Sequence, residues 1–450
     1  MTGGKSAKEE FVRRVRDREA RIGVVGLGYV GLPLAIAYAK NGFRVIGVDT
    51  SSRRAAQLQE GEAPIMDVPG EDVRASVAAG RFCATTDYAA LRDADVVFVC
   101  VPTPFDRAKL PDLRYIENAA SSLAAILQLG QLVILESTTY PGTTEEVLLP
   151  VLERSGLRAG VDFHLAFSPE RIDPGNRTYT IANTPKVVGG IDPESTERAA
   201  VVLEQVVRDG QVRRVSSTRV AELTKLLENT FRSVNIALVN ELAMLCDRMG
   251  LDVWEVIEAA RTKPYGFMPF YPGPGVGGHC IPVDPYYLSW KARQFDFSTK
   301  FIELAAETNQ GMPFFTSDKI RRSLAAAGKS LVGAKILALG AAFKKDVDDA
   351  RNSAAIRVME ILLAEGASLT YHDPYIATVR VRDGLYAEEH TGRELRSVPL
   401  TDEAIRTSDI VAVLVAHSVV DYQRIASLAP LVFDAVSATA GISGGRVVRL

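Results

Sequence analysis

The chain has 450 residues, a formal net charge of −3 and a hydrophobic fraction of 47%. That length exceeds a single hydrophobic core, so two or three domains are expected. The sequence has no dense basic run and no apolar run of about 18 residues, which argues against nucleic-acid binding and against a membrane span. Four cysteines are too few for a disulfide framework, and the charged N-terminal segment lacks the apolar core of a signal peptide. We therefore expect a cytoplasmic protein, and we predict no metal site.

The N-terminal part of the chain alternates strand and helix patterns. The predicted elements, in chain order, are a strand at 21–26, a helix at 30–42, a strand at 43–49, and strands around Val97 and Ile134. Such alternation is typical of a parallel, doubly wound sheet. We assign residues 1–205 to this first α/β domain.

A long helix is predicted from about Thr218 to Met249, where apolar residues recur at helical spacing and no glycine or proline occurs before Gly250. A helix of about 30 residues is too long for a small packed domain. It is therefore expected to form the spine of a helical middle domain, residues 206–328, with surface available for a partner subunit.

The last part of the chain, residues 329–450, again alternates strands and helices. Strands are predicted at AKILALG, ASLTYHDP and SDIVAVLVAH. The expected fold class is therefore α/β, with two Rossmann-like doubly wound domains joined by a long central helix and a helical middle domain.

A dinucleotide-binding pattern lies between the first predicted strand and helix, where Gly26, Gly28 and Gly31 form G-x-G-x-x-G. In this context the glycines permit a tight turn and a close approach of the backbone to a pyrophosphate. Asp49 ends the next strand, where its carboxylate would bind ribose hydroxyls and repel a 2′-phosphate, so NAD is predicted over NADP. The last domain has AAFKKD after its first strand and no such pattern, so no second dinucleotide is expected there.

Cys280 lies in the glycine-rich loop GPGVGGHCIPVDP, where the backbone can approach a ligand closely. Cys83, Cys100 and Cys246 lie in apolar strand or helix contexts and are predicted to be small buried side chains. His279 could pair with Cys280, but adjacent side chains usually point apart, so a structural role is favoured for it. The local pattern by itself leaves Cys280 open between a reactive and a structural thiol.

Joined together, the motifs resemble the UDP-glucose/UDP-mannuronic-acid dehydrogenase family along nearly the whole chain. The matching segments, in order, are GLGYVGLPLA, VPTP, ESTTYPGTT, FSPERIDPGN, AELTKLLENT, PGPGVGGHCIPVDP and AAFKKDVDDAR. The resemblance implies an NAD-dependent enzyme that oxidises carbon 6 of a UDP-sugar twice, first to an aldehyde and then, through a cysteine thioester, to a carboxylate. The catalytic residues that it implies are Cys280, Lys225, Asn229, Asp284, Glu170 and Thr138.

Each implied role has a chemical reason. Cys280 would be the nucleophile, because a thiolate adds readily to an aldehyde. Lys225 and Asn229, one helical turn apart, would stabilise the oxyanion of the thiohemiacetal. Asp284 would organise the water or the Lys225 ammonium, and Glu170 would be the base or the water-positioning group. Spacing alone favours a surface role for Lys225 and Asn229, and Glu170 could instead cap a turn.

The family pattern also implies binding residues for both ligands. Those for NAD are Gly26, Gly28, Tyr29, Val30, Gly31, Asp49, Arg54, Pro102, Thr103 and Thr138. Those for the substrate are Glu170, Arg171, Lys225, Asn229, Tyr271, Gly277, Lys344 and Arg351. Lys344 and Arg351 suit a diphosphate, although a charged surface loop also fits the pattern. Because the central helix is a dimerisation element in the family, a homodimer or higher homo-oligomer is expected.

Two features concern the sugar. His279 in GGHC and the segment SPERIDPGN look more like the branch that acts on N-acetylated UDP-hexosamines than like the glucose branch, which commonly reads GGSC. UDP-N-acetylglucosamine is the first choice, with UDP-N-acetylmannosamine, UDP-N-acetylgalactosamine and UDP-glucose as alternatives, and the product would serve polysaccharide biosynthesis. A single-step hydroxyacid dehydrogenase and an inactive NAD-binding assembly protein are the rival functions, and the presence of Cys280 and Lys225 argues against both.

Overall fold

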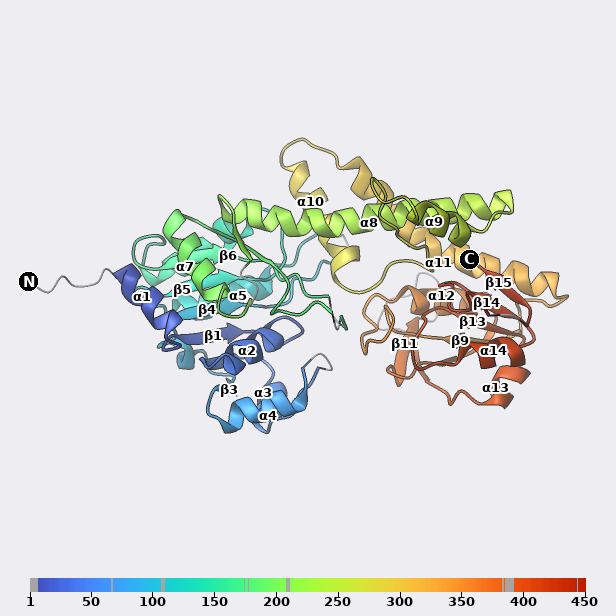
Figure 1. Ribbon diagram of the computed structural model, residues 1–450, viewed down its shortest axis with the longest axis horizontal. Helices are drawn as coiled ribbons and strands as arrows, with labels where there is room; N and C mark the ends of the chain where they lie inside the picture. Colours follow the sequence, from blue (N-terminus) through green and yellow to red (C-terminus); the bar gives the residue numbers. More distant parts are fainter. Residues whose placement is uncertain are drawn as a thin grey trace, which may run out of the picture. The chain divides into compact units, whose positions relative to one another are not determined.

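The fold is given by a computed structural model, which describes residues 7–65, 68–106, 110–173, 175–176, 178–207, 211–382, 384, 392–442 and 444–450. The chain divides into two compact units, and Figure 1 colours the chain from the N-terminus to the C-terminus and labels many of its elements. The N-terminal unit is Met1–Glu228 with Tyr286–Asp296, and the C-terminal unit is Asn229–Pro285 with Phe297–Leu450. The three domain boundaries drawn from the sequence stay a prediction.

The described part of the N-terminal unit holds an eight-stranded sheet. Its strands are β1 Arg21–Val25, β2 Arg44–Val48, β3 Phe82–Thr85, β4 Val96–Val99, β5 Leu132–Leu135, β6 His164–Phe167, β7 Lys186–Gly190 and β8 Val212–Arg214. They lie in the order β3-β2-β1-β4-β5-β6-β7-β8, and every pair is parallel except β6 with β7. The order reverses between β1 and β4, which is where doubly wound sheets bind their ligands.

Helices cover both faces of this sheet. They are α1 Ala7–Arg16, α2 Gly31–Lys40, α3 Ser52–Gln59, α4 Gly70–Ala78, α5 Arg114–Ala124, α6 Leu149–Leu152 and α7 Pro193–Leu203. Successive strand residues point to opposite faces, so Val96 and Phe98 of β4 pack in one hydrophobic cluster and Val97 and Val99 in another. The first cluster includes α1, α2 and α7, and the second includes α5 and α6.

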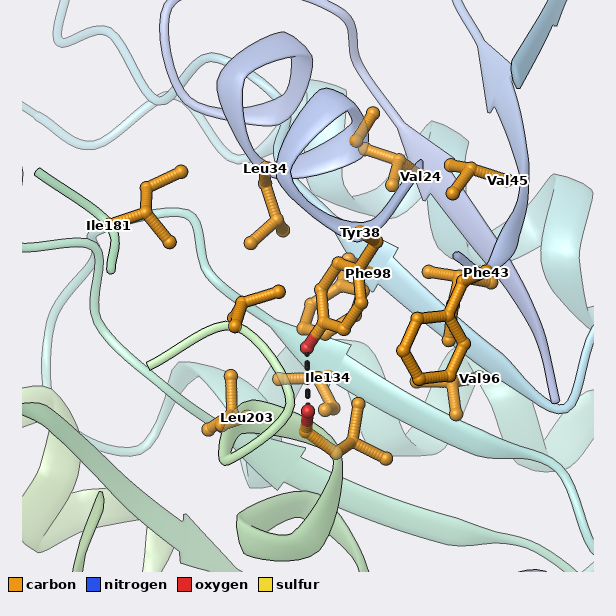
Figure 2. Packing of buried hydrophobic residues seen from close by; sticks show 14 of the residues in the cluster. Val24, Leu34, Tyr38, Phe43, Val45, Val96, Phe98, Ile134, Ile181 and Leu203 are labelled. Atoms are coloured by element: carbon orange, nitrogen blue, oxygen red, sulfur yellow. Dashed lines mark hydrogen bonds between the residues drawn. The ribbon is translucent and has the colours of Figure 1, made fainter. Parts of the chain in front are cut away.

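Helix α2 is fixed to the sheet by Tyr38, which is fully buried (Figure 2). The Tyr38 ring lies edge-on to Phe43 at 5.5 Å and 5.4 Å from the ring of Phe98, between centroids. Its hydroxyl donates to the carbonyl of Val202 at 3.0 Å, so the one polar atom of the ring is satisfied inside the core. This packing holds the helix whose N-terminus carries the glycine loop.

The described part of the C-terminal unit contains a five-stranded parallel sheet in the order β10-β9-β13-β14-β15, and an antiparallel pair, β11 with β12. The strands are β9 Lys335–Leu339, β10 Ser368–His372, β11 Thr378–Arg382, β12 Gly392–Arg396, β13 Ile410–Val413, β14 Val432–Asp434 and β15 Val447–Arg449. This is a second doubly wound order, and its reversal lies between β9 and β13.

Helices account for most of the chain between the two sheets. The remaining helices are α8 Thr218–Met249, α9 Val253–Arg261, α10 Cys280–Arg293, α11 Lys300–Ala326, α12 Ala354–Ala364, α13 Asp402–Thr407 and α14 Tyr422–Leu428. The long helix α8 has the bounds that the sequence predicts. Its second half is joined to α11 by a buried hydrogen bond from Asn240 Nδ2 to Asn309 Oδ1 at 2.9 Å. Two doubly wound sheets, with a helical segment between them in sequence, confirm the expected fold class.

One burial prediction is wrong. Cys100 and Cys246 are buried, but Cys83 is exposed, because β3 is the edge strand of its sheet and only one side of that strand faces the core. Within the described residues, no helix combines the length and the apolar character that crossing a membrane requires.

Candidate active site

The glycine loop joins β1 to α2 with the geometry that a dinucleotide needs. Gly26 has a φ of +90°, a left-handed conformation that favours glycine. A Cβ on Gly31 would lie 1.9 Å from the Gly26 carbonyl, so only glycine lets the helix start this close to the strand. A Cβ on Gly28 would meet nothing within 4 Å. The loop therefore leaves open space at the N-terminus of α2, where a pyrophosphate is stabilised.

The Asp49 carboxylate lies directly against this loop. Its Oδ2 accepts the backbone N–H of Leu27 at 2.9 Å, and its Oδ1 accepts the N–H of Ser51 at 2.9 Å. Arg54 contacts the same carboxylate, with Nη1 3.1 Å from Oδ2. The structure thus brings together the glycine loop, Asp49 and Arg54, as a ribose-binding position beside a pyrophosphate site requires.

We expect kcat/KM with NAD to exceed that with NADP by about tenfold or more, because the Asp49 carboxylate repels a 2′-phosphate. Asp49→Asn should lower the ratio of kcat/KM with NAD to that with NADP, because it removes the negative charge and leaves Arg54 available to the 2′-phosphate of NADP. Asp72→Asn, at an exposed ion pair with Lys40, is the matched control. A wild-type preference for NADP would overturn the role given to Asp49.

Tyr29, predicted from the family pattern to contact NAD, lines a pocket of about 290 Å³. The other walls come from one face of α2, from α4 and from residues 172–173, 175–176 and 179–182, with Ile36 and Ile181 among the lining residues. Val30 occupies the N-cap position of α2 with a helical backbone. The roles of both residues stay predictions.

Two threonines meet where β4 and β5 end. Thr103 Oγ1 donates to the Thr138 carbonyl at 2.7 Å, and Tyr287 of α10 donates to the Thr103 carbonyl. Thr103 and Tyr287 are buried, and Thr138 is half-buried. Because parallel strands end at the same edge of a sheet, these threonines lie at the edge that carries the glycine loop.

Glu170 belongs to a buried charge cluster that the sequence analysis missed. Lys186 Nζ lies 3.0 Å from Glu136 Oε1 and 2.9 Å from Glu170 Oε2, and all three side chains are buried. The second oxygen of Glu170 accepts the N–H groups of Arg171 and Ile172 at 2.6 and 2.8 Å. The sequence feature that could have revealed the cluster is a charged residue at the end of each of two buried strands. Glu136 directly follows β5, and Lys186 is the first residue of β7.

The cluster sets the charge state of each member. Burial raises the pKa of Glu136 to about 7, although Lys186 opposes the shift. Burial acts in the same direction on Glu170, but Lys186 and the backbone N–H groups outweigh it and lower the pKa of Glu170. The two carboxylates outweigh the burial of Lys186 and raise its pKa. Glu170 is therefore a carboxylate at neutral pH, better suited to orienting a water molecule than to holding a proton.

The first turns of α8 bear Glu222 and Lys225. Glu222 is buried and accepts the N–H groups of Gly142 and Thr144 at 2.5 and 2.9 Å, which attaches the ESTTYPGTT loop to the helix. Lys225 is only 8% exposed, and no carboxylate of the described N-terminal unit forms an ion pair with its ammonium. Arg171, by contrast, is paired with Glu228 at 2.6 Å. A nearly buried ammonium that no carboxylate of the described N-terminal unit neutralises is available to a negatively charged ligand.

In the C-terminal unit, Cys280 is exposed and is the first residue of α10. The partial positive charge at a helix N-terminus favours a negatively charged sulfur. The preceding loop is fixed by two hydrogen bonds, from Gly278 N to the Arg351 carbonyl at 2.9 Å and from Asn352 Nδ2 to the Gly278 carbonyl at 3.0 Å. A Cβ on Gly277 would lie 2.8 Å from the Asn352 carbonyl, so glycine is required for this contact.

Asn229 and Asp284 form a buried pair in the same unit. Asn229 Nδ2 donates to Asp284 Oδ2 at 2.5 Å, and neither side chain is more than 4% exposed. Asp284 thereby fixes the orientation of the Asn229 amide. Asp284 is placed to direct Asn229, a task that the sequence analysis did not assign to it.

The remaining candidates of the C-terminal unit differ in how they are held. Arg351 is paired with Asp349 at 2.6 Å, and Lys344 lies on the same loop, with Nζ 5.8 Å from the centre of the Phe343 ring. Burial, reinforced by the charge of Arg351, lowers the pKa of His279, so its imidazole is neutral at neutral pH. Tyr271 is exposed and donates to Glu258 of α9 at 2.7 Å.

A glycine loop and an acidic residue at the reversal point of a doubly wound sheet define a dinucleotide-dependent oxidoreductase. Three family descriptions match the chain in order. They are the NAD-binding domain of the UDP-glucose/GDP-mannose dehydrogenase family over residues 20–207, its central domain over 219–311 and its UDP-binding domain over 337–440. The chain belongs to this family and is an NAD-dependent UDP-sugar dehydrogenase.

Several of its relatives are named for N-acetylated sugars. The chain is 36% identical over 402 residues to a UDP-N-acetyl-D-glucosamine 6-dehydrogenase of Pseudomonas aeruginosa, covering 89% of this chain and 91% of the relative. It is 39% identical over 360 residues to a UDP-N-acetyl-D-mannosamine dehydrogenase of Pyrococcus horikoshii, covering 79% and 84%. The solved structure of a UDP-D-ManNAc dehydrogenase from Pyrococcus horikoshii is similar with a TM-score of 0.85 at 32% identity, covering 95% of this chain and 98% of that chain.

Proposed function

We propose that the chain is a UDP-N-acetylglucosamine 6-dehydrogenase that forms the uronic acid through a thioester on Cys280. The observation that carries this proposal is the attachment of the Cys280 loop to the loop of Lys344 and Arg351, through Gly278 and Asn352. A nucleophile fixed to the segment suited to a diphosphate fits a thiol that attacks the sugar of a UDP-sugar. The choice of sugar rests on the GGHC and SPERIDPGN segments and on the relative from Pseudomonas aeruginosa.

The chemistry assigns one task to each side chain. Bound NAD supplies the hydride acceptor, used twice per sugar. A water molecule takes the proton of the carbon-6 hydroxyl and passes it to solvent. The Lys225 ammonium and the Asn229 amide stabilise the oxygen on carbon 6, first as an alkoxide and then in the thiohemiacetal. The Cys280 sulfur bonds to the aldehyde carbon, and loss of the second hydride leaves a thioester. Glu170 orients the water that hydrolyses it, which releases the carboxylate, returns the thiolate and gives its protons to solvent.

The decisive experiment counts NADH formed per sugar with UDP-N-acetylglucosamine, UDP-N-acetylmannosamine, UDP-N-acetylgalactosamine and UDP-glucose. Two NADH per sugar, with the highest kcat/KM for UDP-N-acetylglucosamine, is the expected result. One NADH per substrate would favour a single-step dehydrogenase. A higher kcat/KM for another UDP-sugar would make that sugar the assigned substrate instead of UDP-N-acetylglucosamine. No NADH with any of them would favour an NAD-binding assembly protein.

Lys225 is proposed to stay protonated and to stabilise oxyanions. Lys225→Ala should therefore cost about 3 kcal/mol or more of transition-state stabilisation, the scale of a lost oxyanion donor. Lys225→Arg should keep part of the rate, because the positive charge survives. Thr224→Ala, at the neighbouring half-buried position, is the control. Equal losses in the Ala and Arg variants, with NAD binding intact, would instead make Lys225 the general base, since Arg does not deprotonate.

We also propose that the second half of α8 binds a second copy of the chain. Leu238, Leu242, Leu245 and Met249 are exposed by 55, 37, 49 and 61%, and their spacing puts them on one face of the helix. An apolar stripe of this kind marks an interaction surface. It agrees with the family's dimerising helix.

Sedimentation equilibrium at micromolar concentration should show at least a dimer. Leu242→Glu together with Leu245→Glu should shift the population towards monomer, because a charge is costly in an apolar interface. Leu129→Glu, at an exposed position of the N-terminal unit, should leave the mass unchanged. A fully active monomeric wild-type protein would count decisively against this interface.

A further inference from the structure

The two sheets share a local arrangement at their reversal points. In the first, Gly26 follows β1 and its N–H donates to the Val48 carbonyl at 2.7 Å. In the second, Gly340 follows β9 with a φ of +90° and its N–H donates to the His372 carbonyl at 2.9 Å. An aspartate comes next after β2 and after β10. Asp373 therefore occupies, in the C-terminal unit, the position that Asp49 has beside the glycine loop.

Asp373 differs from Asp49 because its carboxylate is fully used by the protein. Its Oδ2 accepts the N–H groups of Ala341 and Ala342 at 2.6 and 3.0 Å, and Oδ1 accepts those of Tyr375 and Ile376 at 2.8 and 3.0 Å. His417 Nε2 lies 3.0 Å from Oδ2. Although burial acts to raise it, these donors hold the pKa of Asp373 at about 2. No lone pair is left for a ribose hydroxyl, which is a physical reason to expect no second dinucleotide at this sheet.

His417 connects this carboxylate to the loop that follows β9. The backbone N–H of Asp346 donates to His417 Nδ1 at 3.0 Å, so Nε2 carries the proton and donates to Asp373. The Asp346 side chain accepts Ser418 N and Ser418 Oγ at 2.7 and 2.6 Å. Asp346 has a φ of +58°, a left-handed conformation that is uncommon for a non-glycine residue, and these hydrogen bonds help to hold it.

The loop held in this way is the one that bears Lys344. Asp346 lies two residues after Lys344, and the backbone carbonyl of Arg351 in the same loop accepts the N–H of Gly278, two residues before Cys280. Both ring nitrogens of His417 and both carboxylate oxygens of Asp373 are hydrogen-bonded within the protein, so these side chains are not placed to bind a ligand themselves. They can therefore act on substrate binding through the conformation of this loop.

We propose that His417 is a positioning residue for UDP-sugar binding, which with Asp373 sets the conformation of the loop bearing Lys344. The proposal rests on the proposed function, because the ligand of that loop is taken to be the diphosphate of the substrate. The aspartate after β2, Asp49, is proposed to bind ribose. The corresponding aspartate after β10, Asp373, instead holds the loop proposed to bind the diphosphate. Loss of the hydrogen bonds of His417 lowers the affinity for the UDP part of the substrate. It leaves NAD binding and the rate of the chemical step unchanged.

The test uses the whole enzyme and UDP as the probe, titrated calorimetrically. His417→Phe keeps the ring volume and removes both hydrogen bonds, and should raise the Kd of UDP and the KM of the UDP-sugar by about tenfold. At saturating substrate kcat should change little, and NAD affinity should be unchanged. His417→Gln, which can still donate to Asp373, should recover part of the UDP affinity. His164→Phe, at a buried histidine of the N-terminal unit, is the matched control and should leave UDP affinity unchanged.

Ser418→Ala keeps the test decisive if the phenylalanine variant does not fold. It removes one exposed hydrogen bond to Asp346 and should raise the Kd of UDP about twofold to threefold. Unchanged UDP affinity in both His417→Phe and Ser418→Ala would overturn the positioning role, as would an equal loss of UDP and NAD affinity. A wild-type enzyme that binds neither UDP nor any UDP-sugar would overturn the proposed function and, with it, this role.

Discussion

Cys280→Ser should abolish uronic acid formation, lowering its rate by about three orders of magnitude or more, because a serine hydroxyl is a far poorer nucleophile than a thiolate at neutral pH. The variant should bind NAD with wild-type affinity, since the dinucleotide loop lies in the other unit. The first oxidation does not need the thiol, so any remaining NADH should accompany the aldehyde. Mass spectrometry of the sugar products distinguishes aldehyde from uronate.

Cys83→Ser is the matched control for this experiment. Cys83 is also exposed but lies on the edge strand β3, and its replacement should leave both oxidations unchanged. Uronate formation by the Cys280→Ser variant at the wild-type rate would remove Cys280 from the mechanism. Loss of activity in both variants would point to a general sensitivity of the protein to thiol replacement.

Lys186→Met should destabilise the N-terminal unit by about 3–5 kcal/mol, because it leaves two buried carboxylates without their shared cation. Methionine keeps nearly the same length and volume, so the loss measures the charge and not a cavity. A two-unit chain need not unfold in one step, so the measurement follows the denaturation transition that added NAD shifts. Adding Glu136→Gln to the variant should recover part of the stability, since one carboxylate then remains instead of two.

Lys40→Met supplies the comparison with a surface ion pair. Lys40 lies 2.7 Å from Asp72, but the Lys40 side chain is more than half exposed, so its loss should cost less than about 1 kcal/mol. Equal, small effects of Lys40→Met and Lys186→Met would show that the buried cluster does not stabilise the unit. In that case the ion pair with Lys186 would also not account for the ionised state of Glu170.

The buried clusters show where sequence analysis reaches its limit. Glu136 and Lys186 are 50 residues apart, and each looks locally like a charged residue at a strand end. Asp373 and His417 are 44 residues apart and follow different strands. Local periodicity says which face of an element is apolar, but it does not say which distant strand becomes its neighbour. A buried ion pair depends on that neighbour, so a charged residue at the end of a buried strand marks a candidate, but no local pattern identifies its partner.

The sequence by itself determined the features that depend on local chemistry. The glycine spacing of Gly26, Gly28 and Gly31 specifies a turn that few other residues can make, and the uninterrupted apolar period from Thr218 to Met249 specifies the helix α8 with its ends. Only the tertiary structure decided that Cys83 is exposed, that β7 runs antiparallel to β6, and that Asn229 is paired with Asp284. Each of these depends on strand order or on a contact between distant segments, which is set by the packing of the whole unit and not by the residues nearby.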